Sequence, residues 1–279
     1  MIMDGSGSRT EIDLAIHMTS NFTPQTAPDL TQGQHLIVGA SRGIGLALVN
    51  HLLTHSAETK VMAAARSASQ APALLDLKDR HPERLMLLDV DITEPQSIQD
   101  FAGRIEAKSL AGVINTTGVL HDRDQYIRPE KRLEDIDLTA LESVMRVNAW
   151  GSALLMPALF GKMRTDAPAV FAVISARVGS ISDNRIGGWY AYRASKAALN
   201  QLIKTASIEA KRRYPNLILA ALHPGTTDTD LSKPFQGNVP EDKLFSPEFV
   251  AERLVSVLSG LHADDSGGFF AWDGASIPF

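Results

Sequence analysis

From His35 onward, short apolar runs alternate with stretches in which apolar residues recur every three or four positions. The runs at 113–114 and 169–174 are continuously apolar, which is typical of strands buried on both faces of a parallel sheet. The apolar runs predict strands near 35–39, 60–65, 84–90, 111–115, 168–175, 217–222 and 267–271. The amphipathic stretches predict helices near 43–55, 70–80, 94–107, 138–163, 191–214 and 247–260. This alternation predicts an α/β fold, a doubly wound parallel sheet of about seven strands with helices on both faces.

The first 32 residues lack this alternation. They are polar and contain several glycine, serine and proline residues, which predicts a mobile tail with one short helix around 11–17. No internal repeat and no break in composition interrupts the rest of the chain. We therefore expect a flexible N-terminal tail over residues 1–32 and a single domain over residues 33–279.

Composition and charge narrow the class of protein. The chain has 279 residues, a formal net charge of −5 and no cysteine, which excludes disulfides and thiolate chemistry. A nucleic-acid-binding protein usually carries a basic face, and this acidic balance disfavours that class. No apolar run reaches the length of a membrane span, and the N-terminus lacks the pattern of a secretory signal. We therefore expect a cytoplasmic protein with no nucleic-acid and no membrane partner.

A glycine-rich turn follows the first predicted strand. It reads Gly39-Ala40-Ser41-Arg42-Gly43-Ile44-Gly45, and an amphipathic helix begins within it. Glycine permits the tight turn and lets the backbone approach a pyrophosphate, while the helix N-terminus offers free N–H groups and a positive dipole end. Glycine turns also join strands to helices in proteins without nucleotides, but the strand–turn–helix context favours a nucleotide site.

The end of the second predicted strand indicates which nucleotide is bound. An acidic residue there would bind the adenosine ribose hydroxyls and favour NAD. This chain has Arg66 instead, and Arg42 lies in the glycine turn. Two guanidinium groups without a carboxylate favour the 2′-phosphate of NADP, although either arginine alone is better explained as a solvated loop residue.

Polar residues also follow the third, fourth and sixth predicted strands. Asp91 can accept a hydrogen bond from an adenine amino group, but Asp91 or Asp89 can instead cap the helix that begins near residue 94. A polar turn occupies 115–118, and a Pro-Gly turn with several threonines occupies 224–229. Ligands of open α/β sheets bind at the carboxyl edge of the strands, where these residues are expected to lie.

The helix near 191–214 carries Tyr192 and Lys196 at its start. Residues four apart lie on one face of a helix, so the two side chains are expected to lie together. A fixed ammonium lowers the pKa of a phenol below its usual value near 10, which makes a proton donor and acceptor usable near neutral pH. This spacing is common on helices. Tyr190 has Ala194 at the corresponding position and no lysine.

Three further polar residues are candidates for the site. Asn148 is an amide in an apolar segment, which is more often a structural contact than a water anchor. Ser175 follows the fifth strand and could donate to a substrate oxygen, although lone serines there are usually turn-formers. His223 ends the sixth strand without a second histidine or carboxylate at ligand spacing, so we infer no metal site.

Together these segments resemble the short-chain dehydrogenase/reductase family, single-domain Rossmann-fold oxidoreductases, over nearly all of the chain beyond the tail. The glycines of the turn match the family's Gly-x-x-x-Gly-x-Gly pattern, and Tyr192 with Lys196 matches its Tyr-x-x-x-Lys. Further matches are the Asp91-Ile92 pair, Asn148 and the Pro224-Gly225 turn. The segments 175–181, 187–200 and 272–279 look like the C-factor/sniffer-like carbonyl-reductase branch.

The chain departs from the family pattern at two places. The family's Asn-Asn-Ala-Gly turn is Asn115-Thr116-Thr117-Gly118 here. Most members have two serines after the fifth strand, of which the second is catalytic, whereas this chain has Ser175 followed by Ala176. The spacing to Tyr192 favours Ser180 as the catalytic serine, but Ser175 lies at the carboxyl end of its strand, and we predict Ser175.

The resemblance implies an NADPH-dependent carbonyl reductase, or the reverse alcohol dehydrogenase, acting on a small carbonyl or alcohol substrate. Tyr192 would donate the proton, and Lys196 would lower its pKa and hold the nicotinamide ribose. Ser175 would bind the carbonyl oxygen, and Asn148 would anchor a water that relays protons to Lys196. The expected NADP-binding residues are Gly39, Ser41, Arg42, Gly43, Ile44, Gly45, Arg66, Asp91, Ile92, Asn115, Gly118, Tyr192, Lys196, Pro224, Gly225, Thr227 and Thr229.

Variable loops at the carboxyl edge are expected to enclose the substrate. They are the loops 119–128, 185–189 and 232–244. Trp189, Phe235 and Phe245 suggest an apolar pocket, although aromatic residues in loops are as often structural. The resemblance also implies a homodimer or homotetramer, formed by pairing of the helices near 138–163 and 191–214. The alternative function is a non-enzymatic NADP-binding signalling protein on the same fold.

Overall fold

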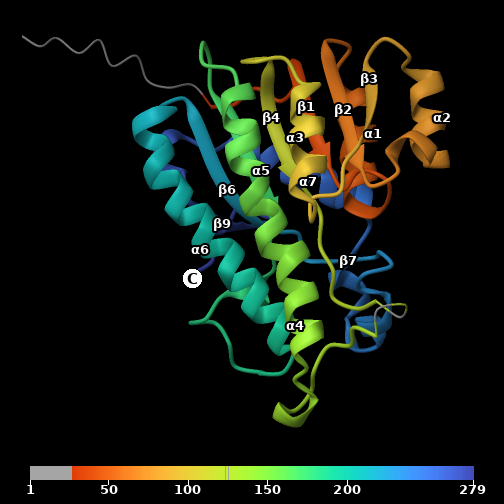
Figure 1. The fold of residues 1–279 in the computed structure, drawn as a ribbon, viewed down its shortest axis with the longest axis vertical. Helices are drawn as coiled ribbons and strands as arrows, with labels where there is room; N and C mark the ends of the chain where they lie inside the picture. Colours follow the sequence, from red (N-terminus) through yellow and green to blue (C-terminus); the bar gives the residue numbers. More distant parts are fainter. Residues whose placement is uncertain (1–26, 123, 125) are drawn as a thin grey trace, which may run out of the picture.

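A central sheet of parallel strands forms the middle of the protein (Figure 1). The computed structural model describes residues 27–279 except 123 and 125. In this part of the chain the sheet has seven strands in the order β3-β2-β1-β4-β5-β6-β9. They are β1 (Gly33–Val38), β2 (Thr59–Ala65), β3 (Leu85–Asp89), β4 (Leu110–Asn115), β5 (Ala169–Ile174), β6 (Leu217–His223) and β9 (Gly268–Ala271). Every neighbouring pair is parallel, so the predicted doubly wound sheet is confirmed.

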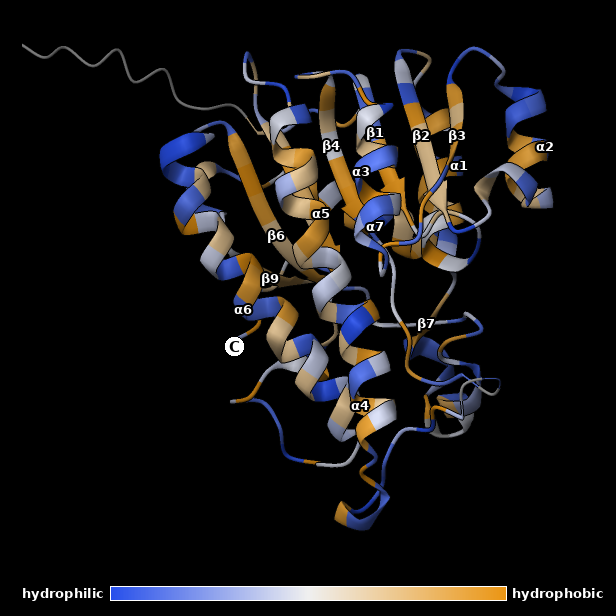
Figure 2. Ribbon diagram, viewed as in Figure 1, coloured by the Kyte–Doolittle hydropathy of each residue, from blue (hydrophilic) through white to orange (hydrophobic). Residues whose placement is uncertain are grey.

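Helices cover both faces of the sheet. One face packs against α3 (Pro95–Gly103), α5 (Gly151–Leu159) and α6 (Tyr190–Arg213), and α4 (Leu138–Met145) leads into α5. The other face packs against α1 (Gly43–His55), α2 (Pro72–Arg80) and α7 (Pro247–Ser259). In Figure 2 the strands are hydrophobic over most of their length, whereas the helices around them carry both hydrophobic and hydrophilic positions.

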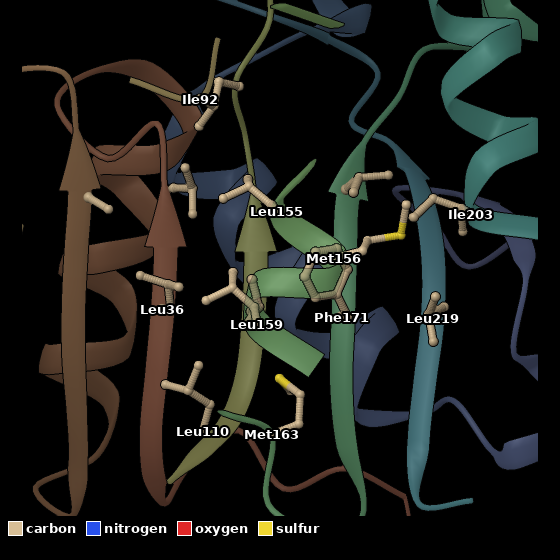
Figure 3. Packing of buried hydrophobic residues seen from close by; sticks show 14 of the residues in the cluster. Leu36, Ile92, Leu110, Leu155, Met156, Leu159, Met163, Phe171, Ile203 and Leu219 are labelled. Carbon is tan, nitrogen blue, oxygen red and sulfur yellow. The ribbon is translucent and has the colours of Figure 1, made fainter. Parts of the chain in front are cut away.

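The strands β4 and β5 are buried at every residue, as their continuously apolar sequences predict. Figure 3 shows Leu155, Met156 and Leu159 of α5 beside Leu36 of β1 and Phe171 of β5. Full burial of one such side chain contributes about 1.5–3 kcal/mol. These contacts fix α5 on the sheet and therefore fix the segment that precedes it.

The helix expected over 138–163 is interrupted. Between α4 and α5, the residues Arg146–Trp150 form one π-helical turn, which contains Asn148. Such turns insert an extra residue into an α-helix and frequently occur at functional sites. Regular periodicity does not predict this turn, so the sequence-based boundary of a single helix was wrong here.

The folded part begins earlier than the predicted boundary at residue 33. Leu30 is buried and packs in the same core cluster as α1 and α7. The Ser56 hydroxyl also donates a hydrogen bond to the carbonyl oxygen of Thr31. The rest of the predicted tail, with the short helix around 11–17, lies outside the described residues.

Two short strands, β7 (Thr226–Thr227) and β8 (Leu244–Phe245), pair outside the main sheet and were not predicted. They close the segment that follows β6 into a loop at the carboxyl edge of the sheet. No helix among the described residues is long and apolar enough to span a membrane.

Candidate active site

The strand order reverses between β1 and β4, because the chain runs from β1 to β2 and β3 and then returns to the other side of β1. Thr116, after β4, joins the two strand ends. Its N–H and its hydroxyl donate to the carbonyl oxygen of Val38 over 2.8 and 2.9 Å. Open α/β sheets bind their ligands at such a reversal, and the predicted site residues gather at this edge.

The glycine turn leaves the N-terminus of α1 free to bind an anion. No side chain caps this helix, which begins at Gly43 and carries Ile44 in its first turn, with Ser41 just before it. A Cβ atom at position 45 would overlap the carbonyl oxygen of Gly39, so only glycine fits there. The free N–H groups and the helix dipole favour a phosphate, and the turn therefore fits the pyrophosphate of a dinucleotide.

The segment after β6 runs past this turn. It begins with Pro224 and Gly225, and a Thr229 methyl group lies 3.1 Å from where a Cβ atom of Gly43 would stand. The Thr227 hydroxyl is buried and has no hydrogen-bond partner among the described residues. Because buried polar groups normally have partners, this hydroxyl fits a ligand bound between the segment and the glycine turn.

Arg42 and Arg66 are both exposed at the same edge. Arg66 directly follows β2 and makes no hydrogen bond or ion pair with the residues that the structure describes. Nη1 of Arg42 lies 3.3 Å from a carboxylate oxygen of Asp230, and both side chains are about 70% exposed. An ion pair this exposed contributes about 0–1 kcal/mol, so a phosphate can replace Asp230 at little cost.

Asp91 follows β3 and forms a local turn, in which Oδ1 accepts hydrogen bonds from the N–H and the hydroxyl of Thr93. Asp89 accepts from the N–H and the hydroxyl of Ser69. The N-cap of α3 is Glu94, and no side chain caps the helix. The alternative that Asp89 or Asp91 caps this helix is therefore wrong, and contact with an adenine stays a prediction for Asp91 and the neighbouring Ile92.

Tyr192 and Lys196 are both buried in the first two turns of α6. Nζ of Lys196 lies 5.8 Å from the centre of the Tyr192 ring and donates to the carbonyl oxygen of Ile174 over 2.8 Å. A Cβ atom at Gly118 would stand 3.5 Å from this Nζ. The pair thus lies beside the turn 115–118, where Asn115 is held by Ser152 and Thr117.

Burial dominates the acid–base properties of this pair. It raises the pKa of Tyr192 above its usual value near 10 and lowers the pKa of Lys196 to about 7. The expectation that Lys196 lowers the pKa of Tyr192 is therefore wrong for this structure. The cause is the burial of Tyr192 itself, and the Lys196 amine donates to the carbonyl oxygen of Ile174.

Both polar atoms of the Asn148 side chain are hydrogen-bonded to the protein. Its Oδ1 accepts from the Val119 N–H over 2.7 Å, and its Nδ2 donates to the Val119 carbonyl over 2.8 Å and to the Ser195 hydroxyl over 3.0 Å. Asn148 thus ties the start of the loop 119–128 to the helix that carries Tyr192 and Lys196. Its role as the anchor of a relay water stays a prediction.

The two candidate serines are both buried, and the hydroxyl group of each already has a hydrogen-bond partner in the protein. The Ser175 hydroxyl donates to Oδ1 of Asn200 over 2.6 Å, and Oγ of Ser180 accepts from the Asp183 N–H over 3.2 Å. To bind a substrate oxygen, Ser175 must release Asn200. Sequence reasoning missed Asn200, although it lies four residues after Lys196 and hence one turn further along the same helix face.

Aromatic rings line the approach to Tyr192. The Trp189 ring lies 6.2 Å from the Tyr192 ring and 5.0 Å from Phe235, and His121 lies 5.8 Å from Phe235. These rings come from the three loops that were expected to enclose the substrate. His121 was not singled out from the sequence, although it is the only histidine in its loop.

Phe245 does not belong to this group. Its ring packs 4.6 Å from Trp272 and 5.0 Å from Phe249, and it lies against Gly225. The expectation that Phe245 lines the substrate pocket is therefore wrong, because the β7–β8 pairing turns its ring toward α7. Among the described residues, no group of three or more histidine, aspartate or glutamate side chains could hold a metal ion.

Comparison with known proteins agrees with this geometry. The sequence pattern of the short chain dehydrogenase family matches residues 34–239. An uncharacterised oxidoreductase of Schizosaccharomyces pombe is 27% identical over 89% of this chain and 99% of its own length. The C-signal protein of Myxococcus xanthus is 32% identical over 53% of this chain and 83% of its own length.

Among solved structures, the NADPH-bound carbonyl reductase from chicken fatty liver superposes with a TM-score of 0.78. It is 27% identical over 89% of this chain and 99% of that chain. The family match, the parallel sheet with its glycine turn and the Tyr192–Lys196 pair lead to one conclusion. The chain belongs to the short-chain dehydrogenase family of oxidoreductases.

Proposed function

We propose that the protein is an NADPH-dependent carbonyl reductase that converts a ketone or aldehyde to an alcohol, or catalyses the reverse reaction. The observation that carries the proposal is the buried Tyr192–Lys196 pair beside Gly118, at the edge of the sheet that contains the glycine turn. The NADPH-bound carbonyl reductase from chicken supports this assignment by its similarity in fold and sequence.

Tyr192 acts as the proton donor in this proposal. When bound, NADPH supplies the hydride that adds to the carbonyl carbon. Tyr192 donates its proton to the carbonyl oxygen, where negative charge develops, and its raised pKa keeps it protonated at neutral pH. Lys196, whose pKa burial lowers to about 7, can return a proton to the phenolate in this pH range.

The other residues of the site bind the cofactor and orient the substrate. The N-terminus of α1 would bind the pyrophosphate, and Arg42 and Arg66 would bind the 2′-phosphate. Thr227 would donate its free hydroxyl to the cofactor. Ser175 would turn from Asn200 to the carbonyl oxygen, and Asn148 would hold the relay water. The rings of Trp189 and Phe235 would exclude bulk water from the reacting carbonyl.

The test follows NADPH consumption with a panel of ketones and aldehydes. Tyr192→Phe should lower turnover by about 10²–10⁴ while NADPH binding is retained, because only the proton donor is lost. Tyr190→Phe is the matched control, since no lysine lies one turn beyond it. A Tyr190→Phe enzyme that lost activity while Tyr192→Phe kept it would contradict the assignment.

A second candidate function is signalling without turnover on the same fold, and the C-signal protein, similar over 53% of this chain, is the relative whose name suggests it. Such a protein would bind NADPH and show no reduction with any carbonyl of the panel. Its biological effect would then be unchanged by Tyr192→Phe and lost when NADPH binding is lost.

The proposal includes a homodimer or homotetramer in the cytoplasm. Trp150 and Leu154 lie one turn apart around the start of α5 and are 45% and 39% exposed. Exposed apolar residues at this spacing support pairing of α4, α5 and α6 with a second copy of the chain.

A further inference from the structure

The start of the helix that carries Tyr192 has an unusual backbone. Trp189, the N-cap of α6, has φ 55° and ψ 47°, and its side chain caps nothing. Gly187 and Gly188, which precede it, have φ values of 71° and 66°. Three consecutive residues are thus left-handed, and for tryptophan this conformation costs roughly 1–2 kcal/mol. Such a turn persists only when its surroundings hold it.

Glu130 binds the N–H side of this turn. Its carboxylate oxygens both accept from the Ala191 N–H over 3.3 Å, and its carbonyl oxygen accepts from the Trp189 N–H over 2.6 Å. The residue is only 3% exposed and forms no ion pair with any described side chain. The positive end of the α6 dipole is therefore the charge that stabilises this buried carboxylate.

Arg193 binds the carbonyl side of the same turn. Its Nε donates to the Gly188 carbonyl over 2.9 Å, and its Nη2 donates to the Gly187 carbonyl over 3.0 Å. Its Nη1 reaches the Val178 carbonyl over 3.4 Å. The motif from Tyr192 to Lys196 contains Arg193, and the proposed reaction gives this residue no role.

The turn determines where two rings of the site lie. Trp189 packs against Tyr192 and Phe235, and Tyr192 follows Ala191 directly in the first turn of α6. Glu130 also follows the loop 119–128, whose start is held by Asn148. The same carboxylate thus joins the end of a substrate loop to the proton donor.

We propose that Glu130 and Arg193 form a clamp on the turn 187–189 and act as positioning residues for Tyr192 and Trp189. This inference rests on the proposed function for its catalytic consequence. A misplacement near 1 Å of a proton donor lowers turnover by about a hundredfold. Loss of the clamp therefore lowers kcat and moves the Trp189 ring, while the glycine turn still binds NADPH.

The test combines kinetics with ¹⁹F NMR of the protein labelled with 5-fluorotryptophan. The chain has three tryptophans, so Trp189→Phe assigns the resonance of Trp189. Glu130→Ala should shift or broaden this resonance, lower kcat about tenfold to a hundredfold and leave the Kd for NADPH within about twofold. Glu130→Gln keeps an oxygen acceptor of the same size and should restore most of kcat. If Glu130→Ala fails to fold, Glu130→Gln is the variant that is compared with wild type instead.

Arg193→Met should shift the Trp189 resonance in the same way, because it removes the carbonyl-side donors and keeps much of the side-chain length. Glu134→Gln, at an exposed glutamate four residues after Glu130, is the control and should behave as wild type. An unchanged Trp189 resonance in Glu130→Ala overturns the clamp, and so does a parallel loss of NADPH binding. A shifted resonance in a protein that reduces no carbonyl would instead support the clamp and refute the proposed function.

Discussion

Lys196 is 2% exposed, and its amine donates to a backbone carbonyl instead of a carboxylate. A lysine in this environment loses hydration without gaining an ion pair, which explains why burial lowers its pKa to about 7. Tyr192 is desolvated in the same way and stays protonated. At the residue scale, burial therefore moves the proton affinities of the two groups apart, so that Tyr192 keeps its proton while Lys196 releases its own more readily.

Arg42 and Arg66 provide a prediction about cofactor choice. The double variant Arg42→Ala with Arg66→Ala should weaken NADPH binding much more than NADH binding, because only NADPH carries the 2′-phosphate. Each charge-assisted hydrogen bond to such an anion contributes about 1.5–3 kcal/mol. Titration of both cofactors into wild type and variant measures this, and equal losses for the two cofactors would refute it.

A second residue-scale prediction separates the two serines. Ser175→Ala should lower kcat by about 10²–10³ at saturating NADPH, as for other donors to a developing oxyanion. Ser180→Ala should have little effect on kcat, because its hydroxyl contacts the Asp183 N–H and the Ser182 hydroxyl within its own loop. The hydrogen bond from Ser175 to Asn200 makes the outcome informative. A normal Ser175→Ala enzyme would show that this hydroxyl only links β5 to α6.

At the scale of elements, the π-helical turn 146–150 connects the substrate loop to the catalytic helix. It places Asn148 where one side chain binds both backbone groups of Val119 and the hydroxyl of Ser195. A regular helix would carry this position further around its axis. The turn thus couples the loop 119–128 to α6 from one side, while Glu130 does so from the other.

Asn148→Ala should therefore lower both the stability of the protein and the rate of the reaction. Loss of three buried hydrogen bonds, each contributing about 0.5–1.5 kcal/mol, predicts a decrease in the free energy of unfolding of about 2–4 kcal/mol. Denaturant unfolding followed by circular dichroism measures this. If Asn148 only anchored a relay water, activity would fall and the free energy of unfolding would stay that of the wild type.

The alternation of apolar runs and amphipathic stretches was enough to predict the sheet and its helices, because parallel strands such as β4 and β5 are buried on both faces. The glycine turn and the Tyr192–Lys196 pair follow from local spacing. The contact of Glu130 with Ala191 spans 61 positions and has no local signature. The rings of Phe235 and Phe245 lie in different places because of the β7–β8 pairing. Strands of two residues have no sequence pattern from which this pairing could be predicted.

At the scale of the whole molecule, the fold places a buried histidine and a partly buried histidine at opposite edges of the sheet. His35 lies near the start of β1, and His223 ends β6. Burial lowers the pKa of each to about 4, and Nδ1 of each has no hydrogen-bond partner among the described residues. The folded protein therefore keeps both rings neutral where the unfolded chain, with pKa values near 6.5, takes up protons.

This difference predicts the response of the folded state to acid. Between pH 6.5 and 4 the unfolded chain binds more protons than the folded protein, so the free energy of unfolding falls as the pH falls. The stabilisation is fully present above pH 6.5. For a pKa lowered from 6.5 to about 4, each histidine accounts for a loss of about 3 kcal/mol, near 1.4 kcal/mol per pH unit.

His35→Leu should remove about half of this loss, because leucine fills a similar volume and takes up no proton. His35 is preferable to His223 for this test, since it lies at the end of its strand away from the glycine turn. Urea unfolding at pH 7.5, 5.5 and 4.5 gives the free energy of unfolding at each pH, with the exposed His55→Gln as the control. If the free energy of unfolding of His35→Leu fell with pH as steeply as that of wild type, other groups would have to cause the acid sensitivity.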